Sequence, residues 1–148
     1  MRIFSTIVVL ASVLASVAAG AQEPAAPAVR FEAVDVYIDS AERPLAAYQF
    51  EFAAETGEIK IVGVEGGEHE AFKHPPYYDP AALSNDRIII AAFNTGQNLP
   101  SGRTRVARIH LQVTGAVGPE YVIIVSAAAT SDGEKIPARG TIAQGEGE

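Results

Sequence analysis

The side chains best suited to metal chemistry lie in the middle of the chain. His69 and His74 supply imidazole nitrogens, and Glu68, Glu70 and Asp79 supply carboxylate oxygens, all of which are ligands of divalent metal ions. The four residues between the two histidines match no zinc motif, and a loop does not hold both rings on one face. We therefore favour solvated loop histidines over a metal site.

The remaining polar residues offer no complete catalytic arrangement. No G-x-S-x-G elbow is present to expose a nucleophilic serine beside a histidine such as His110. Asp35 and Asp39 share one face of an expected strand, where a solvated surface is favoured over the carboxylate pair of a glycoside hydrolase. The glycines near Gly66 lack the following helix whose N-terminus would bind a phosphate. The sequence therefore favours a protein that is not an enzyme.

Asp132 offers oxygen ligands to calcium within the segment Ser131–Glu134. A single short acidic turn supplies fewer ligands than the roughly six to eight oxygens that calcium takes. An ordinary hairpin turn at Asp132-Gly133 is the favoured interpretation, and we expect no cofactor.

The segment most indicative of binding is His74–Pro80, which holds Tyr77 and Tyr78 between prolines. Prolines restrict a loop before it binds, and exposed tyrosines offer a flat amphipathic surface to a protein or a sugar. We take His74, Tyr77, Tyr78 and Asp79 as candidate partner-binding residues. The alternative is that both tyrosine rings fold back over the end of the fold as a lid on the core.

A second candidate surface is the basic cluster of Arg103, Arg105 and Arg108. The alternation of the surrounding residues places Arg105 on the apolar side of a strand, and Arg108 and His110 on the outward side. The cluster either pairs with an acidic partner or is a solvated strand end, and the second interpretation is favoured. We include Arg108 and His110 among the candidate partner-binding residues.

The composition restricts the class of protein further. The chain has 148 residues, which is the size of one domain, and no cysteine, which excludes disulfides and thiolate chemistry. A formal net charge of -7 argues against nucleic acid as a partner, because binding phosphates requires a basic surface.

Residues 1–21 have the pattern of a secretory signal peptide. Arg2 precedes an apolar run that ends in the small residues Ala19-Gly20-Ala21, a pattern typical of signal peptidase cleavage. The run is short for a membrane span, so we expect cleavage after Ala21 and no membrane anchor in the mature protein. A Pro/Ala-rich linker at residues 22–28 follows, and we expect the protein to be periplasmic or extracellular.

The rest of the chain predicts strands. Apolar residues recur with a period of two, Gly and Pro mark the turns, and residues 65–83 form the longest irregular segment, with one helical turn at Asp79–Leu83. We predict an antiparallel β-sandwich or jelly roll of about seven to nine strands over residues 29–142, with a disordered tail at 143–148. The predicted core contains Val36, Ile38, Tyr48, Phe50, Ile89, Ile109, Leu111, Ile123 and Val125.

Three details of this prediction concern particular strands. Arg87–Phe93 and Tyr121–Val125 are nearly continuous apolar runs, which is typical of strands covered on both faces. Lys135–Ile142, after the tight-turn signal Asp132-Gly133, is predicted to be the closing strand.

Five segments occur in the same order, and with similar residues, in a known family. These segments are Leu45–Phe52, Ile59–Gly67, Asn85–Phe93, Gly102–Val113 and Asp132–Ile136. They resemble the cohesin domain and its carbohydrate-binding-module-like relatives. A Tyr-Asp-Pro motif that the family has after the second strand stands here at Tyr78–Pro80, inside the long loop. The resemblance implies a nine-strand jelly roll used for docking, with a dockerin-like protein as partner.

Two functions follow from these observations. The favoured one is an exported, non-catalytic docking or adhesion module that binds a protein through a sandwich face or through the 65–83 loop. The alternative is a carbohydrate-binding module with a polysaccharide as partner. The lack of Trp and the aromatic content of 7% count against the alternative, because sugar-binding sites use flat aromatic rings.

Overall fold

The computed structural model describes residues 23–145, so the predicted signal peptide and its cleavage site lie outside the described residues. Residues 23–28, which belong to the predicted linker, are exposed and irregular. The strands are β1 (Val29–Asp39), β2 (Ala47–Thr56), β3 (Glu58–Gly66), β4 (Arg87–Phe93), β5 (Arg103–Thr114), β6 (Glu120–Ala129) and β7 (Arg139–Gln144). Two short 3₁₀ helices, η1 (Glu70–Phe72) and η2 (Pro80–Ala82), lie between β3 and β4. No helix in residues 23–145 is long and apolar enough to cross a membrane.

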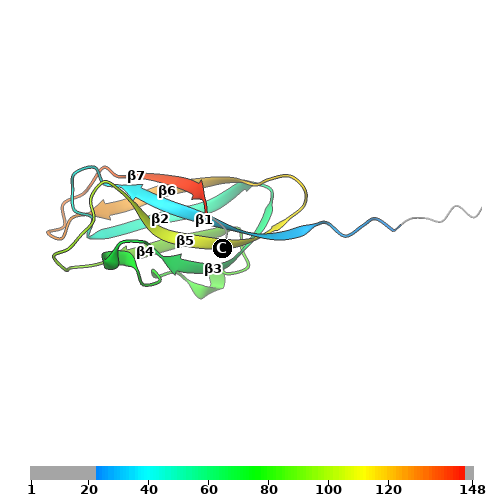
Figure 1. Cartoon of the computed structure of the whole chain (residues 1–148), viewed down its shortest axis with the longest axis horizontal. Coiled ribbons are helices and arrows are strands. Elements are labelled where there is room, and N and C mark those ends of the chain that lie inside the picture. Colours follow the sequence, from blue (N-terminus) through cyan, green and yellow to red (C-terminus); the bar gives the residue numbers. More distant parts are fainter. Residues whose placement is uncertain (1–22, 146–148) are drawn as a thin grey trace, which may run out of the picture.

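The strands form two antiparallel sheets that pack face to face (Figure 1). One sheet has the order β3-β5-β1-β7, and the other has the order β4-β2-β6. Consecutive strands therefore alternate between the sheets, and every connection crosses from one sheet to the other. The predicted antiparallel β-sandwich is confirmed.

The core lies between the sheets, where period-two alternation buries one face of each strand. Six predicted core residues are buried: Val36, Ile38, Tyr48, Phe50, Ile109 and Leu111. Ile89 is a wrong prediction, since its neighbours Ile88 and Ile90 point inward and Ile89 is 53% exposed. Ile123 and Val125 pack against the core but are only half-buried.

Ile89 is exposed because the sheet β4-β2-β6 packs against the other sheet with its inner face only, and its outer face is uncovered. The apolar runs of β4 and β6 were predicted to be covered on both sides, and the exposure of Ile89 and Ile124 contradicts this. In β4 and β6, a continuous apolar run therefore indicates that the inner residues belong to the core and that the outer face of the strand is apolar too.

A β-bulge in β5 changes the predicted side of Arg105. Val36 pairs with Ala107 and Tyr37 pairs with Arg105, so Val106 is an extra residue, and both Val106 and Ala107 are buried. The extra residue reverses the alternation, and Arg105 lies on the outer face of the sheet. Its predicted position on the apolar side is wrong.

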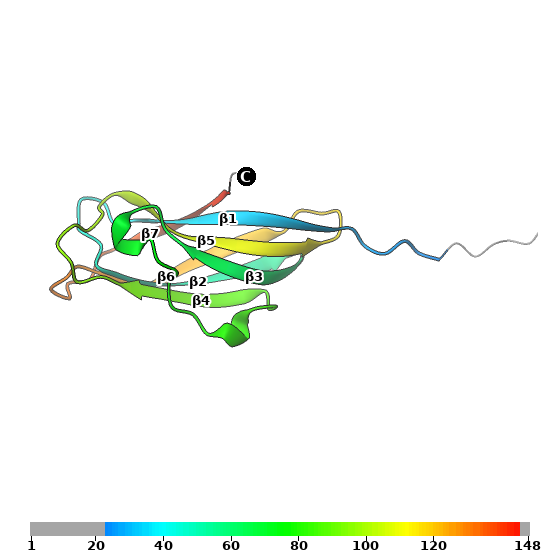
Figure 2. The same ribbon diagram turned by 60° about the horizontal axis from the view of Figure 1, so that its bottom comes forward.

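The β3–β4 connection covers the side of the sandwich where β3 and β4 are neighbouring edge strands (Figure 2). Phe72 of η1 is buried, and its ring lies edge-on to that of Tyr48 with centroids 5.1 Å apart. The connection passes close to the backbone of Gly66, where a Cβ atom would lie 2.1 Å from the carbonyl oxygen of Lys73. Glycine is therefore required at this position. The connection is the predicted irregular segment, and η2 is its predicted helical turn.

The closing strand begins later than predicted. Residues 130–134 form a turn in which the backbone N–H of Gly133 donates to the carbonyl of Thr130, and Lys135 makes only an isolated bridge with Ala129. β7 begins at Arg139, pairs with β1 and continues to Gln144, two residues past the predicted end of the domain.

Candidate functional site

The two adjacent tyrosines of the long loop point in different directions. Tyr77 forms a bridge with Ala91 at the edge of β4 through two backbone hydrogen bonds of 2.8 and 3.0 Å, and its side chain is 69% exposed. Tyr78 is half-buried and packs against the core. Tyr77 is therefore a surface residue, whereas Tyr78 covers part of the core, as the lid alternative predicts.

The other candidates in this loop have local contacts. Asp79 caps η2, because its Oδ1 accepts a hydrogen bond of 2.9 Å from the backbone N–H of Ala81. His69 caps η1 in the same way, with Nδ1 accepting from Ala71 at 3.1 Å. His74 is exposed. Among residues 23–145, no three His, Cys, Asp or Glu side chains gather closely enough to hold a metal ion.

Tyr77 lies at the rim of the outer face of β4-β2-β6. Its ring stacks with that of Phe93, with centroids 6.2 Å apart and an angle of 12° between the planes, and Phe93 is 66% exposed. The register places Phe93, Ala47 and Ala129 in one row across the sheet, and the next row contains Ala91. The alanines form the floor of a hollow of about 260 Å³ beside the two rings.

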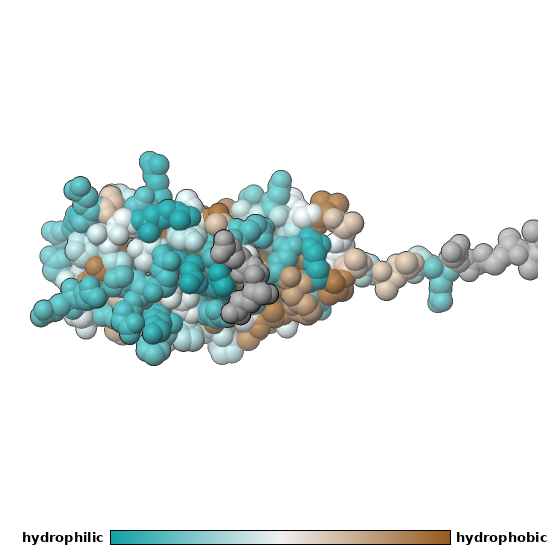
Figure 3. Space-filling view, viewed as in Figure 1, coloured by the Kyte–Doolittle hydropathy of each residue, from teal (hydrophilic) through white to brown (hydrophobic). Residues whose placement is uncertain are grey.

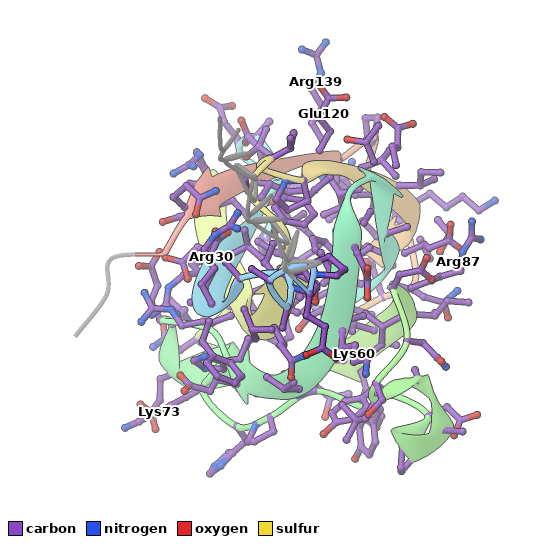
Figure 4. All side chains as sticks on the ribbon, turned by 90° about the vertical axis from the view of Figure 1, so that its right-hand side faces the viewer. Arg30, Lys60, Lys73, Arg87, Glu120 and Arg139 are labelled. Atoms are coloured by element: carbon purple, nitrogen blue, oxygen red, sulfur yellow. The ribbon has the colours of Figure 1, made fainter. Side chains whose placement is uncertain are left out.

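The same outer face continues to a second pair of large apolar side chains. Ile89 and Ile124 flank Glu51 in one cross-strand row, and Ile124 is 54% exposed. Glu51 pairs with Arg87 at 3.0 Å, and Figure 4 shows Arg87 projecting from the β4 side of the sandwich. The outer face of β4-β2-β6, from Tyr77 and Phe93 to Ile89 and Ile124, is called the apolar face below.

Arg108 and His110 lie on the opposite side of the sandwich, on the outer face of β3-β5-β1-β7. Arg108 donates two hydrogen bonds to Asp35, of 2.8 and 3.1 Å, and Arg105 lies 3.7 Å from the same carboxylate. The hydrogen bonds from Arg108 lower the pKa of Asp35, and the charges of Arg108 and Arg105 act in the same direction, against the effect of burial. Asp35 is buried, so its predicted place on a solvated surface is wrong.

His110 pairs with Glu65 across β5 and β3, with 2.7 Å between its Nε2 and a carboxylate oxygen. Both line a hollow of about 740 Å³ on this outer face, together with Arg108 and the exposed side chain of Phe31. Most of the face is hydrophilic, and hydrophobic residues gather toward the end from which the N-terminal segment leaves (Figure 3). We call this outer face the charged face.

Arg103 and Arg105 complete the basic cluster of the charged face. The guanidinium carbon of Arg103 lies 3.4 Å from the centre of the Tyr37 ring, which is a cation–π contact. The cluster is therefore held by partners within the chain, and the six candidate residues do not form one site. The loop candidates and the pair of Arg108 and His110 lie on opposite sides of the sandwich.

Asp132 has partners within its own turn. Its carboxylate accepts a hydrogen bond from the hydroxyl of Thr130, and this bond lowers the pKa of Asp132. Glu134 of the same turn pairs with Arg43. These contacts stabilise the turn that the sequence predicts at this position.

Sequence reasoning found Tyr77 but missed the other residues that make the apolar face. Phe93 and Ile89 belong to the run Arg87–Phe93, and its continuity was a usable signal. In a two-layer fold each strand exposes the side chains that point to the outer face of its sheet, so the same pattern indicates either a strand covered on both faces or an exposed apolar face. Phe31 carried no signal, because it alternates with charged residues.

No family model, no curated protein and no solved structure matches this chain.

Proposed function

We propose that the mature protein is an exported, non-catalytic module that docks a protein partner through its apolar face. The observation that carries this proposal is the exposure of Tyr77, Ile89, Phe93 and Ile124 together on one side of one sheet. Monomeric proteins rarely expose contiguous apolar patches of this kind, and such patches mark interaction sites.

The shape of the apolar face supports a protein as the partner. Small alanine side chains leave a shallow hollow at one end of the face, and the rings of Tyr77 and Phe93 stand at its edge. Partner side chains that enter such a hollow are shielded from water by the surrounding residues, which is where binding energy concentrates. Tyr and Phe are enriched at the centres of protein interfaces.

The position of Tyr77 is fixed before any partner binds. Its backbone forms two hydrogen bonds with Ala91, and Pro75 and Pro76 precede it in the chain. A preorganised side chain loses less entropy on binding, so more of its contact free energy appears as affinity. The resemblance to cohesins makes a dockerin-like protein the first partner to examine.

Three further parts of the proposal come from the sequence. The pattern of residues 1–21 supports export to the periplasm or beyond the cell. The sequence contains no recognisable catalytic motif, which supports a role in binding without chemistry. The acidic composition supports a protein partner over nucleic acid.

Affinity capture from the exported protein fraction tests the proposal. The mature chain is immobilised, and bound proteins are quantified by mass spectrometry for the unchanged chain, Phe93→Ala and Phe31→Ala. Phe31 is the matched control, because it is an equally exposed phenylalanine on the opposite outer face. We expect a partner whose capture falls with Phe93→Ala and persists with Phe31→Ala.

The docking proposal fails if the captured proteins are the same for Phe93→Ala and for the unchanged chain. Melting temperatures of the two variants identify any loss that comes from unfolding, since truncating exposed rings is expected to change stability little.

A further inference from the structure

Each sheet of the sandwich has two edge strands, which have a neighbouring strand on one side only. Proteins protect such edges from other chains with charged side chains, with covering segments or with short strands. β3 carries Glu58, Lys60 and Glu65 on its exposed side. β4 already forms a bridge with Tyr77 of its own loop, at Ala91. β7 has only six residues. The remaining edge strand is β6.

β6 has none of these protections. It is ten residues long, and it holds no charged residue after Glu120 and no proline. From Tyr121 to Val125 every residue is aromatic or β-branched, which are the residue types that favour strands. Its one irregularity is the extra residue Ser126, which lies beyond this run. A long apolar edge of this kind is a site where a further strand pairs.

The register shows which backbone groups of β6 are available. The backbone N–H of Ala54 donates to the carbonyl of Asp86, on the β4 side of β2. Its neighbour Ala53 therefore points to β6, where it lies opposite Val122. Successive residues of an antiparallel strand direct their backbone groups to opposite sides. Ile123, which follows Val122, therefore directs its N–H and C=O groups out of the sheet, toward the open edge.

A second copy of β6 is complementary to this edge. Antiparallel pairing about a two-fold axis at Ile123 places Tyr121 opposite Val125 of the second copy. It also places Val122 opposite Ile124 of the second copy. Pairs of aromatic and β-branched residues stabilise antiparallel strands. The chain as a whole has a formal net charge of -7, and two copies of this uncharged run meet without repulsion between like charges.

Charged residues next to this run support the same pairing. The register places Glu120 opposite Ser126 of the second copy. Arg139 begins β7 close to this level, because a Cβ atom at the adjacent Gly140 would lie 2.9 Å from the side chain of Val125. Glu120 and Arg139 are both exposed, and they project from the side of the sandwich where β6 and β7 lie (Figure 4).

These two side chains are available to a second copy. Within residues 23–145, neither Glu120 nor Arg139 forms an ion pair. Antiparallel pairing of the β6 edges brings Glu120 of one copy toward Arg139 of the other. The two-fold axis repeats this contact, so the pairing has opposite charges on both sides of the apolar run.

From this geometry we infer that the protein forms a two-fold symmetric dimer in which the β6 edges of two copies pair antiparallel. Two sheets of the order β4-β2-β6 then join into one continuous sheet. The apolar faces of the two copies lie side by side on it. The inference does not depend on the docking proposal, because edge pairing uses backbone groups and leaves the outer face open.

Analytical ultracentrifugation of the mature chain alone tests the dimer, at concentrations up to several hundred micromolar. Ile124→Lys places a positive charge on each copy close to the two-fold axis, and lysine on an edge strand opposes pairing. Ile89→Lys is the matched control, because Ile89 and Ile124 lie in one row of the same outer face and are 53% and 54% exposed. We expect dimers for the unchanged chain and for Ile89→Lys, and a monomer for Ile124→Lys. All three should keep a similar melting temperature.

A charge exchange tests the register of the pairing. Glu120→Arg and Arg139→Glu each bring like charges together at two places in the dimer, so each should weaken dimerisation about tenfold. The chain with both substitutions has opposite charges again, and we expect it to regain the affinity of the unchanged chain. A change in folding alone would not be reversed by the second substitution.

Sedimentation of the unchanged chain as a monomer at every concentration overturns the inference. Dimers that persist in Ile124→Lys, or that are lost equally in Ile89→Lys, place the contact elsewhere and overturn the assignment to β6. A double variant that dimerises as weakly as the single variants contradicts the antiparallel register. These results leave the docking proposal untouched, because they are measured without a partner, whereas docking is measured by capture with Phe93→Ala.

Discussion

Two neighbouring isoleucines of β4 report on whether the apolar face is a real outer surface. Ile90 is fully buried between the sheets, whereas Ile89 points outward and is half-exposed. Ile90→Ala leaves a cavity in the core, and we expect the free energy of unfolding to fall by about 2–5 kcal/mol. Ile89→Ala removes the same atoms from a side chain that already meets water, so we expect a fall of about 1 kcal/mol or less.

The difference is large enough to measure by urea denaturation and by thermal melting. For a domain of this size, each kcal/mol lowers the melting temperature by roughly 3–6 °C, so Ile90→Ala should melt roughly 6–30 °C below the unchanged chain. Ile89→Ala should melt within roughly 5 °C of it. An unchanged denaturant slope shows that both variants unfold from the same compact state.

Partner capture gives Ile89→Ala a second readout. If the apolar face docks a protein, capture should fall in Ile89→Ala although its stability is nearly unchanged. Equal losses of stability in Ile89→Ala and Ile90→Ala would refute the reasoning. That result would mean that both faces of β4 are covered in solution, and no free apolar face would remain for docking.

Three further predictions concern the loop and the buried ion pair. Tyr77→Ala should keep the melting temperature, whereas Tyr78→Ala should lower it, and differential scanning fluorimetry of both variants checks this. Asp35→Asn should be less stable at neutral pH, because it breaks the bonds with Arg108. The folded-state pKa of Asp35 is lowered, so its stabilisation is present above its ordinary pKa near 4 and is lost as the pH falls through the folded pKa. Denaturation curves between roughly pH 7 and 2 should therefore show the two chains converging in acid. Gly66→Ala should destabilise the fold, since its Cβ would meet a backbone oxygen of the long loop, and its urea midpoint should fall.

The alternation of consecutive strands between two sheets gives the protein two different outer faces. Odd-numbered strands contribute to the charged face, and even-numbered strands contribute to the apolar face. Each outer face is therefore assembled from residues that are far apart in the sequence. His110 and Glu65 are 45 residues apart, and they meet because β5 and β3 are neighbours.

Local patterns in the sequence determined the fold class of this protein. Period-two alternation in segments such as Val34–Ile38 buries one face of a strand in any two-layer fold, so the all-β sandwich and six core residues were predictable. The tight turn near Asp132 and the irregular segment after Gly66 were predictable for the same reason, because glycine and proline act on the backbone locally.

Only the tertiary structure decided which surfaces those strands expose. The run Arg87–Phe93 is the same whether one or both faces of its strand are covered. Ile89 is a surface residue because it points to the outer face of β4-β2-β6, and only the inner face of that sheet packs against the other sheet. Arg105 lies on the outer face of its sheet and not on the predicted inner face, because the β-bulge in β5 opposite β1 reverses the alternation of side chains. Tyr77 and Tyr78 differ because one bonds to β4 and the other packs on the core. Side-chain identity and spacing act along the chain, whereas exposure depends on which distant strands cover each face.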